Sequence, residues 1–129
     1  MKIRTGIIGC GRIAQRHAQH IQNHEEAEVV SVYDIDSQAC QSFAKSIQAH
    51  GSNSYEALLA NDAVDIIHVC TPNGLHYEHT MQALEAGKHV LVEKPMALST
   101  QHCEEMVNRA LQKNKQLFVV MQNLSLIHI

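Results

Sequence analysis

The chain has 129 residues with 45% hydrophobic content, and 10 Lys and Arg against 13 Asp and Glu leave a formal net charge of -3. Its length predicts one domain with a substantial core, and because no basic block is present we expect no nucleic-acid partner. The first apolar run is too short for a signal sequence or a membrane span, so we expect a cytoplasmic protein without a membrane partner.

Continuous apolar runs, rich in Val and Ile, recur at residues 3–8, 29–33, 64–70, 89–92 and 117–121. Amphipathic stretches lie between them, and we predict helices over residues 12–23, 37–49, 55–60, 75–86 and 100–113. Because the runs do not alternate with polar residues, they are typical of parallel strands covered on both faces. The order of elements predicts an α/β fold with a doubly wound, mostly parallel sheet.

A glycine-rich motif follows the first strand and opens the first helix. Gly9, Gly11 and Ala14 form G-x-G-x-x-A. In this context the first glycine permits a tight turn, the second leaves room for a pyrophosphate, and the alanine keeps the helix close to the sheet. The helix N-terminus then faces the anion, so the motif predicts a dinucleotide site. The alternative is a glycine turn of purely conformational origin.

An acidic residue ends the second strand. Asp34 lies about 20 residues beyond the glycine motif, where a carboxylate binds ribose hydroxyls and repels a 2′-phosphate. The next residue, Ile35, supplies no compensating cation. We therefore expect NAD to be preferred over NADP. In the alternative, Asp34 solvates a turn and Asp36 caps the following helix.

Polar residues also follow the next two strands, and ligands of open parallel sheets bind at this carboxyl edge. Thr71 and Asn73 offer a hydroxyl and an amide there, beside a turn that Pro72 fixes. Glu93 and Lys94 end the following strand. In a closed site Lys94 could hydrogen-bond a reacting oxygen, with Glu93 orienting it or holding ribose. The alternative for both charges is a solvated strand end.

The spacing of the histidines and cysteines bears on whether the chain has a metal or redox site. His17, His20 and His24 could share one helical face, but no carboxylate or thiol joins them at ligand spacing, so we expect no metal. The cysteines lie far apart without a CxxC pair, which favours reduced thiols.

Several segments together resemble the N-terminal domain of the Gfo/Idh/MocA oxidoreductases: GIIGCGRIAQRH, VYDID, VCTPNGLHYEH and GKHVLVEKPMALS. The resemblance covers nearly the whole chain, from Ile3 to Asn123. It implies a Rossmann fold, a nicotinamide cofactor, a second domain for substrate and oligomer contacts, and hydride transfer on sugars or cyclitols. By motif position, Lys94 would be the catalytic residue near the substrate oxygen. The cofactor would be bound by Gly9, Gly11, Arg12, Ile13, Asp34, Thr71, Asn73, His76, Glu93, Gln122 and Asn123.

The end of the chain departs from the family pattern. Family members continue for about two hundred further residues, whereas this chain ends in an apolar segment at residues 124–129. We therefore assign residues 1–123 to the dinucleotide-binding domain and expect residues 124–129 to be an aberrant or truncated tail. The substrate domain and its downstream Asp/His pair would then be absent.

These observations predict the cofactor-binding portion of an NAD-dependent dehydrogenase acting on a secondary alcohol of a sugar, cyclitol or nucleotide sugar. The full-length protein is expected to form a homo-oligomer, and the chain alone to turn over little or no substrate. Two alternatives remain. A non-catalytic NAD sensor would need Asp34 and the glycines but not Lys94. A non-binding remnant would retain the core and self-associate through its uncovered apolar face.

Overall fold

A computed structural model of the chain describes residues 2–120 and 126–128. In this part of the chain the strands form one seven-stranded sheet of order β3-β2-β1-β4-β5-β6-β7. All neighbouring pairs from β3 to β6 are parallel, and only β7 runs antiparallel to its neighbour β6. The doubly wound, mostly parallel sheet is thus confirmed. The strand bounds are β1 (Ile3–Ile8), β2 (Ala27–Tyr33), β3 (His50–Gly51), β4 (Ile66–Val69), β5 (His89–Glu93), β6 (Leu117–Val120) and β7 (Leu126–His128).

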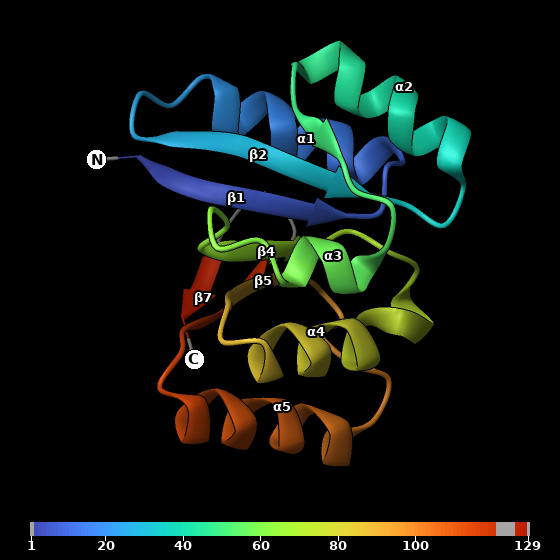
Figure 1. The fold of residues 1–129 in the computed structure, drawn as a ribbon. Coiled ribbons are helices and arrows are strands. Elements are labelled where there is room, and N and C mark those ends of the chain that lie inside the picture. The colour runs from blue at the N-terminus through green and yellow to red at the C-terminus, as the bar shows by residue number, and fades with distance from the viewer. Residues whose placement is uncertain (1, 121–125, 129) are drawn as a thin grey trace.

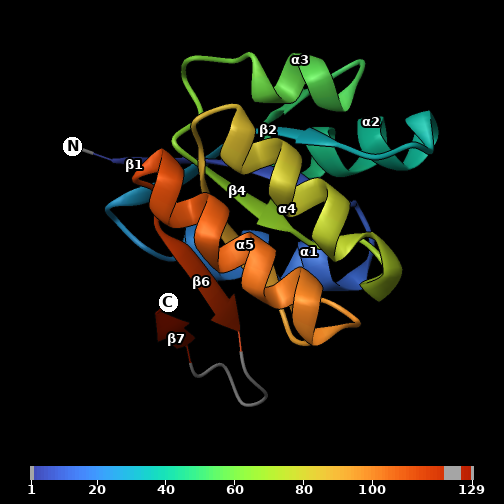
Figure 2. The same ribbon diagram turned by 90° about the horizontal axis from the view of Figure 1, so that it is seen from below.

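Helices cover both faces of this sheet (Figures 1 and 2). Helices α1 and α2 pack on one face, over β1 and β2, while α3, α4 and α5 lie on the other. The predicted helices are all present, and their ends differ from the predictions by a few residues. Their bounds are α1 (Arg12–Gln22), α2 (Ser37–Ile47), α3 (Tyr55–Leu59), α4 (His76–Glu85) and α5 (Thr100–Lys113), with a 3-10 turn, η1 (Asn73–Leu75), before α4.

The sheet separates two apolar cores. On the α1 side, Ile7 and Val32 pack against Ala14 and Ala18, whose exposed fractions are 0% and 1%. Alanine at these positions lets α1 approach the sheet closely, as the third position of the glycine motif predicts. On the other side, α4 and α5 cover a larger core formed mainly by β4, β5 and β6. Within the described residues, no helix combines the length and apolar character needed to cross a membrane.

Two short strands were not predicted. The β3 strand is only two residues long and pairs with the β2 edge. At the other edge, β7 pairs with β6, whereas the sequence suggested only an apolar tail over residues 124–129. Both strands form because an edge strand leaves a row of backbone donors and acceptors open for pairing.

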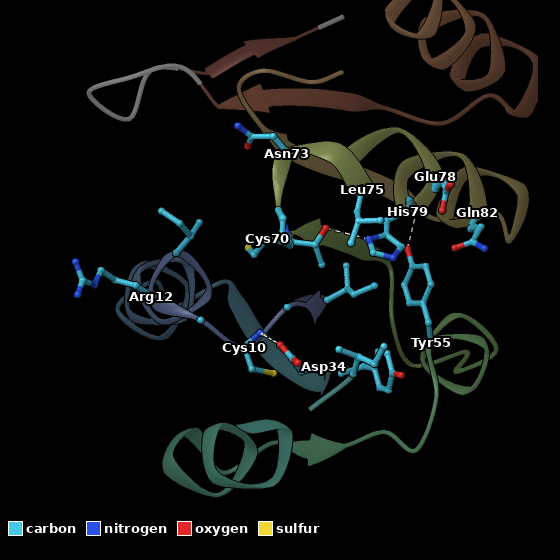
Figure 3. A pocket seen from close by; sticks show the side chains of 18 of the residues that line it. Cys10, Arg12, Asp34, Tyr55, Cys70, Asn73, Leu75, Glu78, His79 and Gln82 are labelled. Carbon is cyan, nitrogen blue, oxygen red and sulfur yellow. Dashed lines mark hydrogen bonds between the residues drawn. The ribbon is translucent and has the colours of Figure 1, made fainter. Parts of the chain in front are cut away.

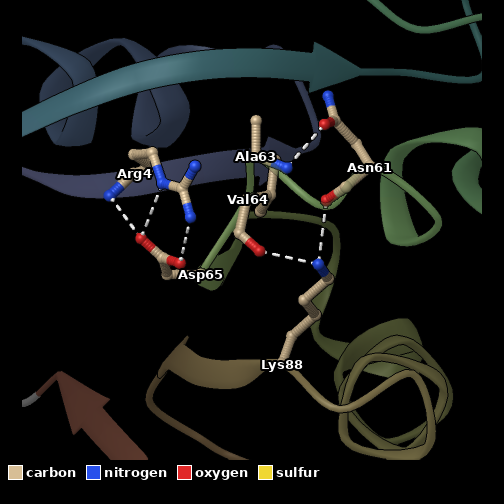
Figure 4. A network of polar contacts seen from close by, with 6 residues as sticks. All are labelled: Arg4, Asn61, Ala63, Val64, Asp65 and Lys88. Carbon is tan, nitrogen blue, oxygen red and sulfur yellow. Dashed lines mark hydrogen bonds and ion pairs between the residues drawn. The ribbon is translucent and has the colours of Figure 1, made fainter.

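The two ends of the parallel strands differ in character. At the carboxyl edge, the segments following β1, β2 and β4 surround a cavity whose walls carry polar side chains (Figure 3). The amino edge, in contrast, is closed by a polar network (Figure 4). Ligands of doubly wound sheets bind at the carboxyl edge, so the candidate site lies there.

A buried lysine organises the amino edge. Lys88 has an exposed fraction of 7%, and its ammonium group donates to the carbonyl oxygens of Asn61 at 2.9 Å and Val64 at 2.6 Å. Beside it, the Arg4 guanidinium donates to both carboxylate oxygens of Asp65, at 3.2 and 3.0 Å. This pair lowers the pKa of Asp65. The network ties the loop before β4 to β1 and to the start of β5 (Figure 4).

Replacing Lys88 tests this network. Lys88→Met removes two charge-assisted hydrogen bonds and leaves two shielded carbonyl oxygens without their donor. We expect the free energy of unfolding to fall by about 2 kcal/mol. Urea denaturation measures this change, and Lys45→Met, on the exposed surface of α2, is the matched control. Equal stability of the two variants would show that the Lys88 contacts contribute nothing.

Candidate functional site

The turn after β1 brings two strand ends very close together. Gly9 has a φ of +96°, in the left-handed region that favours glycine. A Cβ atom built at Gly9 would lie 2.7 Å from the carbonyl oxygen of Cys70, at the end of β4. Only glycine fits there, so this position determines how closely the β1 and β4 loops approach.

The N-terminus of α1 is uncapped and open among the residues that the structure describes. Gly11 is its N-cap residue, no side chain caps the helix, and the first turn carries no acidic residue. Helices α2, α3 and α5, in contrast, are capped by the side chains of Asp36, Ser54 and Ser99 respectively. A Cβ atom at Gly11 would meet nothing within 4 Å, so the main chain here faces open space. The free N–H groups and the helix dipole make this end a suitable anion site.

Asp34 connects the glycine turn to the end of β2. Its carboxylate accepts the backbone N–H of Cys10 at 2.7 Å through one oxygen, and that of Asp36 at 2.8 Å through the other. A carboxylate has about four lone-pair sites, so acceptor capacity remains for a ligand. Asp36, in turn, caps α2 by accepting from Gln38 and Ala39. Both acidic residues therefore have structural contacts, and Asp34 also lies in the cavity wall.

The cavity has a volume of about 790 Å³, and Figure 3 shows many of the side chains around it. The sequence-predicted site residues Gly9, Gly11, Arg12, Ile13, Asp34, Thr71 and Asn73 all line it. The structure adds lining residues from α3, η1 and α4 that sequence reasoning missed: Tyr55, Glu56, Leu75, Glu78, His79 and Gln82.

Polar contacts hold together the part of the cavity wall that α3 and α4 form. The Thr71 hydroxyl and His79 Nδ1 lie 2.9 Å apart, and the Tyr55 hydroxyl donates to the His79 carbonyl oxygen at 2.7 Å. The Tyr55 and His79 rings also meet edge to face, with centroids 5.2 Å apart. Burial lowers the pKa of His79. No sequence motif marks these residues, because only the packing of α3 beside α4 brings them together.

The two cysteines at the cavity are not nucleophiles. Burial, with smaller contributions from Cys40 and Asp34, raises the pKa of Cys10 to about 12. Burial also raises the pKa of Cys70, and the Glu93 charge adds to this effect. Neutral, shielded thiols react poorly, so these cysteines contribute packing to the site.

His76, which the sequence predicts to contact a cofactor, is buried between two loops. Its exposed fraction is 1%, and it is not among the cavity-lining residues. Its ring nitrogens lie 2.7 Å from the Pro95 carbonyl oxygen and 2.8 Å from that of Thr71. Because both nitrogens already face backbone oxygens, His76 connects the loop after β4 to the loop after β5.

The predicted residues of β5 lie outside the cavity lining. Glu93 is directed toward α1, where its Oε1 lies 2.6 Å from His17 Nε2. Lys94 is exposed, and its backbone N–H donates to the Val120 carbonyl oxygen at 3.0 Å. The predicted cofactor residues Gln122 and Asn123 lie outside the described residues.

The three histidines of the possible metal site, His17, His20 and His24, do not share one helical face. His24 lies beyond the end of α1 at Gln22, and His20 is exposed. His17 instead contacts His68 and Glu93. Among the residues that the structure describes, no group of three or more His, Cys, Asp or Glu residues is arranged to hold a metal ion.

Comparison with known proteins agrees with this geometry. A family model described as "Oxidoreductase family, NAD-binding Rossmann fold" matches residues 3–121. Glucose-6-phosphate 3-dehydrogenase of Bacillus subtilis is 41% identical over 107 residues, which are 83% of this chain and 30% of that protein. The chain spans about a third of the length of the curated relatives it matches.

Solved structures are also similar. The WlbA dehydrogenase from Bordetella pertussis, in complex with NADH and UDP-GlcNAcA, has a TM-score of 0.91 and 36% identity, covering 95% of this chain and 38% of that one. KijD10, a 3-ketoreductase from Actinomadura kijaniata in complex with NADP, has a TM-score of 0.89 and 32% identity, covering 93% and 39%. The fold is therefore shared with nicotinamide-dependent oxidoreductases.

The two motif glycines are expected to differ in their effect on stability. Gly9→Ala forces a strained φ and a backbone clash, so the free energy of unfolding should fall by about 2 kcal/mol or more. Gly11→Ala adds a methyl group to open space at an ordinary backbone conformation, and should cost less than about 1 kcal/mol. Urea denaturation of both variants measures the difference. Equal losses would contradict the geometry described for Gly9.

Proposed function

Since the chain belongs to the Gfo/Idh/MocA oxidoreductase family, with its NAD-binding Rossmann fold, we propose that it is the cofactor-binding portion of an NAD(P)-dependent dehydrogenase. The observation that carries this proposal is the open N-terminus of α1 beside Gly11, within the wall of the cavity. A side chain at Gly11 would fill the space through which a pyrophosphate approaches the free N–H groups. Arg12 adds a positive charge at the same place.

The adenosine half of the cofactor would lie on the β2 side of the glycine turn. Asp34 would accept hydrogen bonds from the ribose hydroxyls through its remaining lone pairs. Because a carboxylate repels a 2′-phosphate, and Ile35 beside it is apolar, we propose that NAD binds more tightly than NADP. The cofactors named for the similar structures, NADH and NADP, show that relatives differ on this point.

The nicotinamide half would lie over the ends of β4 and β5, on the opposite side of the turn. Thr71 and Asn73 line this approach, and Lys94 is exposed at the end of β5. When bound, the cofactor supplies hydride transfer at its nicotinamide ring. We assign to Lys94 Nζ the hydrogen bond to the reacting oxygen and the movement of its proton.

The substrate class is proposed from the names of the relatives. They include dehydrogenases of a sugar phosphate, a glucoside and inositols. A secondary alcohol of a sugar, cyclitol or nucleotide sugar is therefore the substrate we propose. The greater part of each relative has no counterpart in this chain, so we expect these 129 residues to bind cofactor but turn over little or no substrate.

Calorimetric titration with NAD and NADP tests the cofactor assignment. The wild-type chain should bind NAD more tightly than NADP. Asp34→Asn keeps the size of the side chain but removes its charge, and should weaken NAD binding about ten-fold while narrowing the preference over NADP. Asp36→Asn is the matched control, because it removes the same charge two residues away and retains an N-cap residue.

The possible results test the Asp34 assignment, the preference for NAD and cofactor binding separately. A preference for NAD over NADP that is lost in Asp34→Asn and kept in Asp36→Asn supports the assignment of Asp34 to the ribose. Tighter binding of NADP by the wild-type chain would overturn the preference for NAD, and no binding of either cofactor by a folded chain would overturn the proposed function.

A further inference from the structure

Three ionisable side chains meet between α1 and the sheet, outside the cavity. His17 Nδ1 lies 2.8 Å from His68 Nδ1, and His17 Nε2 lies 2.6 Å from Glu93 Oε1. The exposed fraction is 10% for the His17 side chain and 26% for that of Glu93, while His68 is buried. The cluster joins α1, β4 and β5, although its members are separated by 51 and 76 residues from His17.

The chemistry of the three groups orders their hydrogen bonds. Burial, and then the neighbouring His17, lower the pKa of His68 to about 3, so His68 is neutral at ordinary pH. The Glu93 carboxylate only accepts, so His17 Nε2 donates to it. One of the two facing Nδ1 atoms, of His17 or of His68, donates to the other. The cluster links His68 through His17 to Glu93.

This cluster ends at the segment that carries Lys94. Glu93 is fixed by His17, the Lys94 backbone N–H donates to Val120, and the Pro95 carbonyl oxygen lies 2.7 Å from His76 Nδ1. Residues 93–95 are therefore held from three sides. Of these contacts, only that of His17 comes from α1, the helix whose N-terminus lies in the cavity wall.

We propose that His17 is a positioning residue that fixes residues 93–95 relative to α1, so that one rigid unit presents both the pyrophosphate site and Lys94. The inference rests on the proposed function, because it assigns the two halves of a nicotinamide dinucleotide to the two ends of this unit. In the sheet order, Asp34 at β2 lies on one side of β1 and Glu93 at β5 on the other. Loss of His17 therefore disturbs the nicotinamide half selectively.

Two ligands, NADH and ADP-ribose, distinguish a positioning role of His17 from a purely structural one. NADH spans both halves of the site, whereas ADP-ribose lacks the nicotinamide. His17→Phe keeps an aromatic ring but removes both hydrogen bonds, so it should weaken NADH binding about ten-fold and change ADP-ribose binding less than about two-fold. His17→Gln retains a donor and an acceptor and should recover most of the NADH affinity. His20→Phe, on the exposed side of α1, is the matched control.

A second readout needs no variant and remains available if His17→Phe fails to fold. Imidazole nitrogen NMR of the wild-type chain should show the His17 resonances shifting when NADH binds and staying in place when ADP-ribose binds. Equal loss of both affinities, no loss of either, or equal NMR shifts would overturn the positioning role alone. Failure of the folded wild-type chain to bind NADH and ADP-ribose would overturn the proposed function, and this inference with it.

Discussion

The close approach of Gly9 to the main chain of Cys70 is the constraint on which the site depends. A Cβ atom at Gly9 would lie 2.7 Å from the Cys70 carbonyl oxygen and clash with it, so the β1 and β4 loops meet only because Gly9 has no side chain. From this contact the chain enters α1 with its N-terminus facing the cavity, and the Asp34 carboxylate fixes the turn by accepting from Cys10. The proposed anion site and the proposed ribose site thus have one geometric origin.

The stabilising contacts and the open polar groups lie at opposite edges of the sheet. At the amino edge, Lys88 and the Arg4–Asp65 pair satisfy the polar groups that close the loops (Figure 4). At the carboxyl edge, the α1 N-terminus lacks a side-chain cap, and the wall around it carries acceptors and donors (Figure 3). The polar contacts at the amino edge therefore hold the loops in place, while hydrogen-bonding groups at the carboxyl edge stay open to a ligand. Such a preorganised site costs less free energy to order when a ligand binds.

Local patterns in the sequence predicted the elements and the glycine-centred half of the site. Apolar runs and the Gly9–Gly11 motif depend on residues close in the chain, and the structure confirms the strands, the helices and the fold. The convergence of His17 on Glu93 could not be predicted, because it depends on β4 and β5 following β1 in the sheet. The position of His76 between the loops after β4 and β5 could not be predicted either, because a motif position does not show which way a side chain points.

We propose above all that the N-terminus of α1 binds the pyrophosphate of a nicotinamide dinucleotide. Backbone amide NMR during titration with NAD tests this claim most directly, because it reports each N–H group separately. We expect saturable shifts at Gly11, Arg12 and Ile13, with Lys88 at the opposite edge unchanged. Saturation without a shift at the α1 N-terminus, or shifts concentrated at the Lys88 edge, would contradict it.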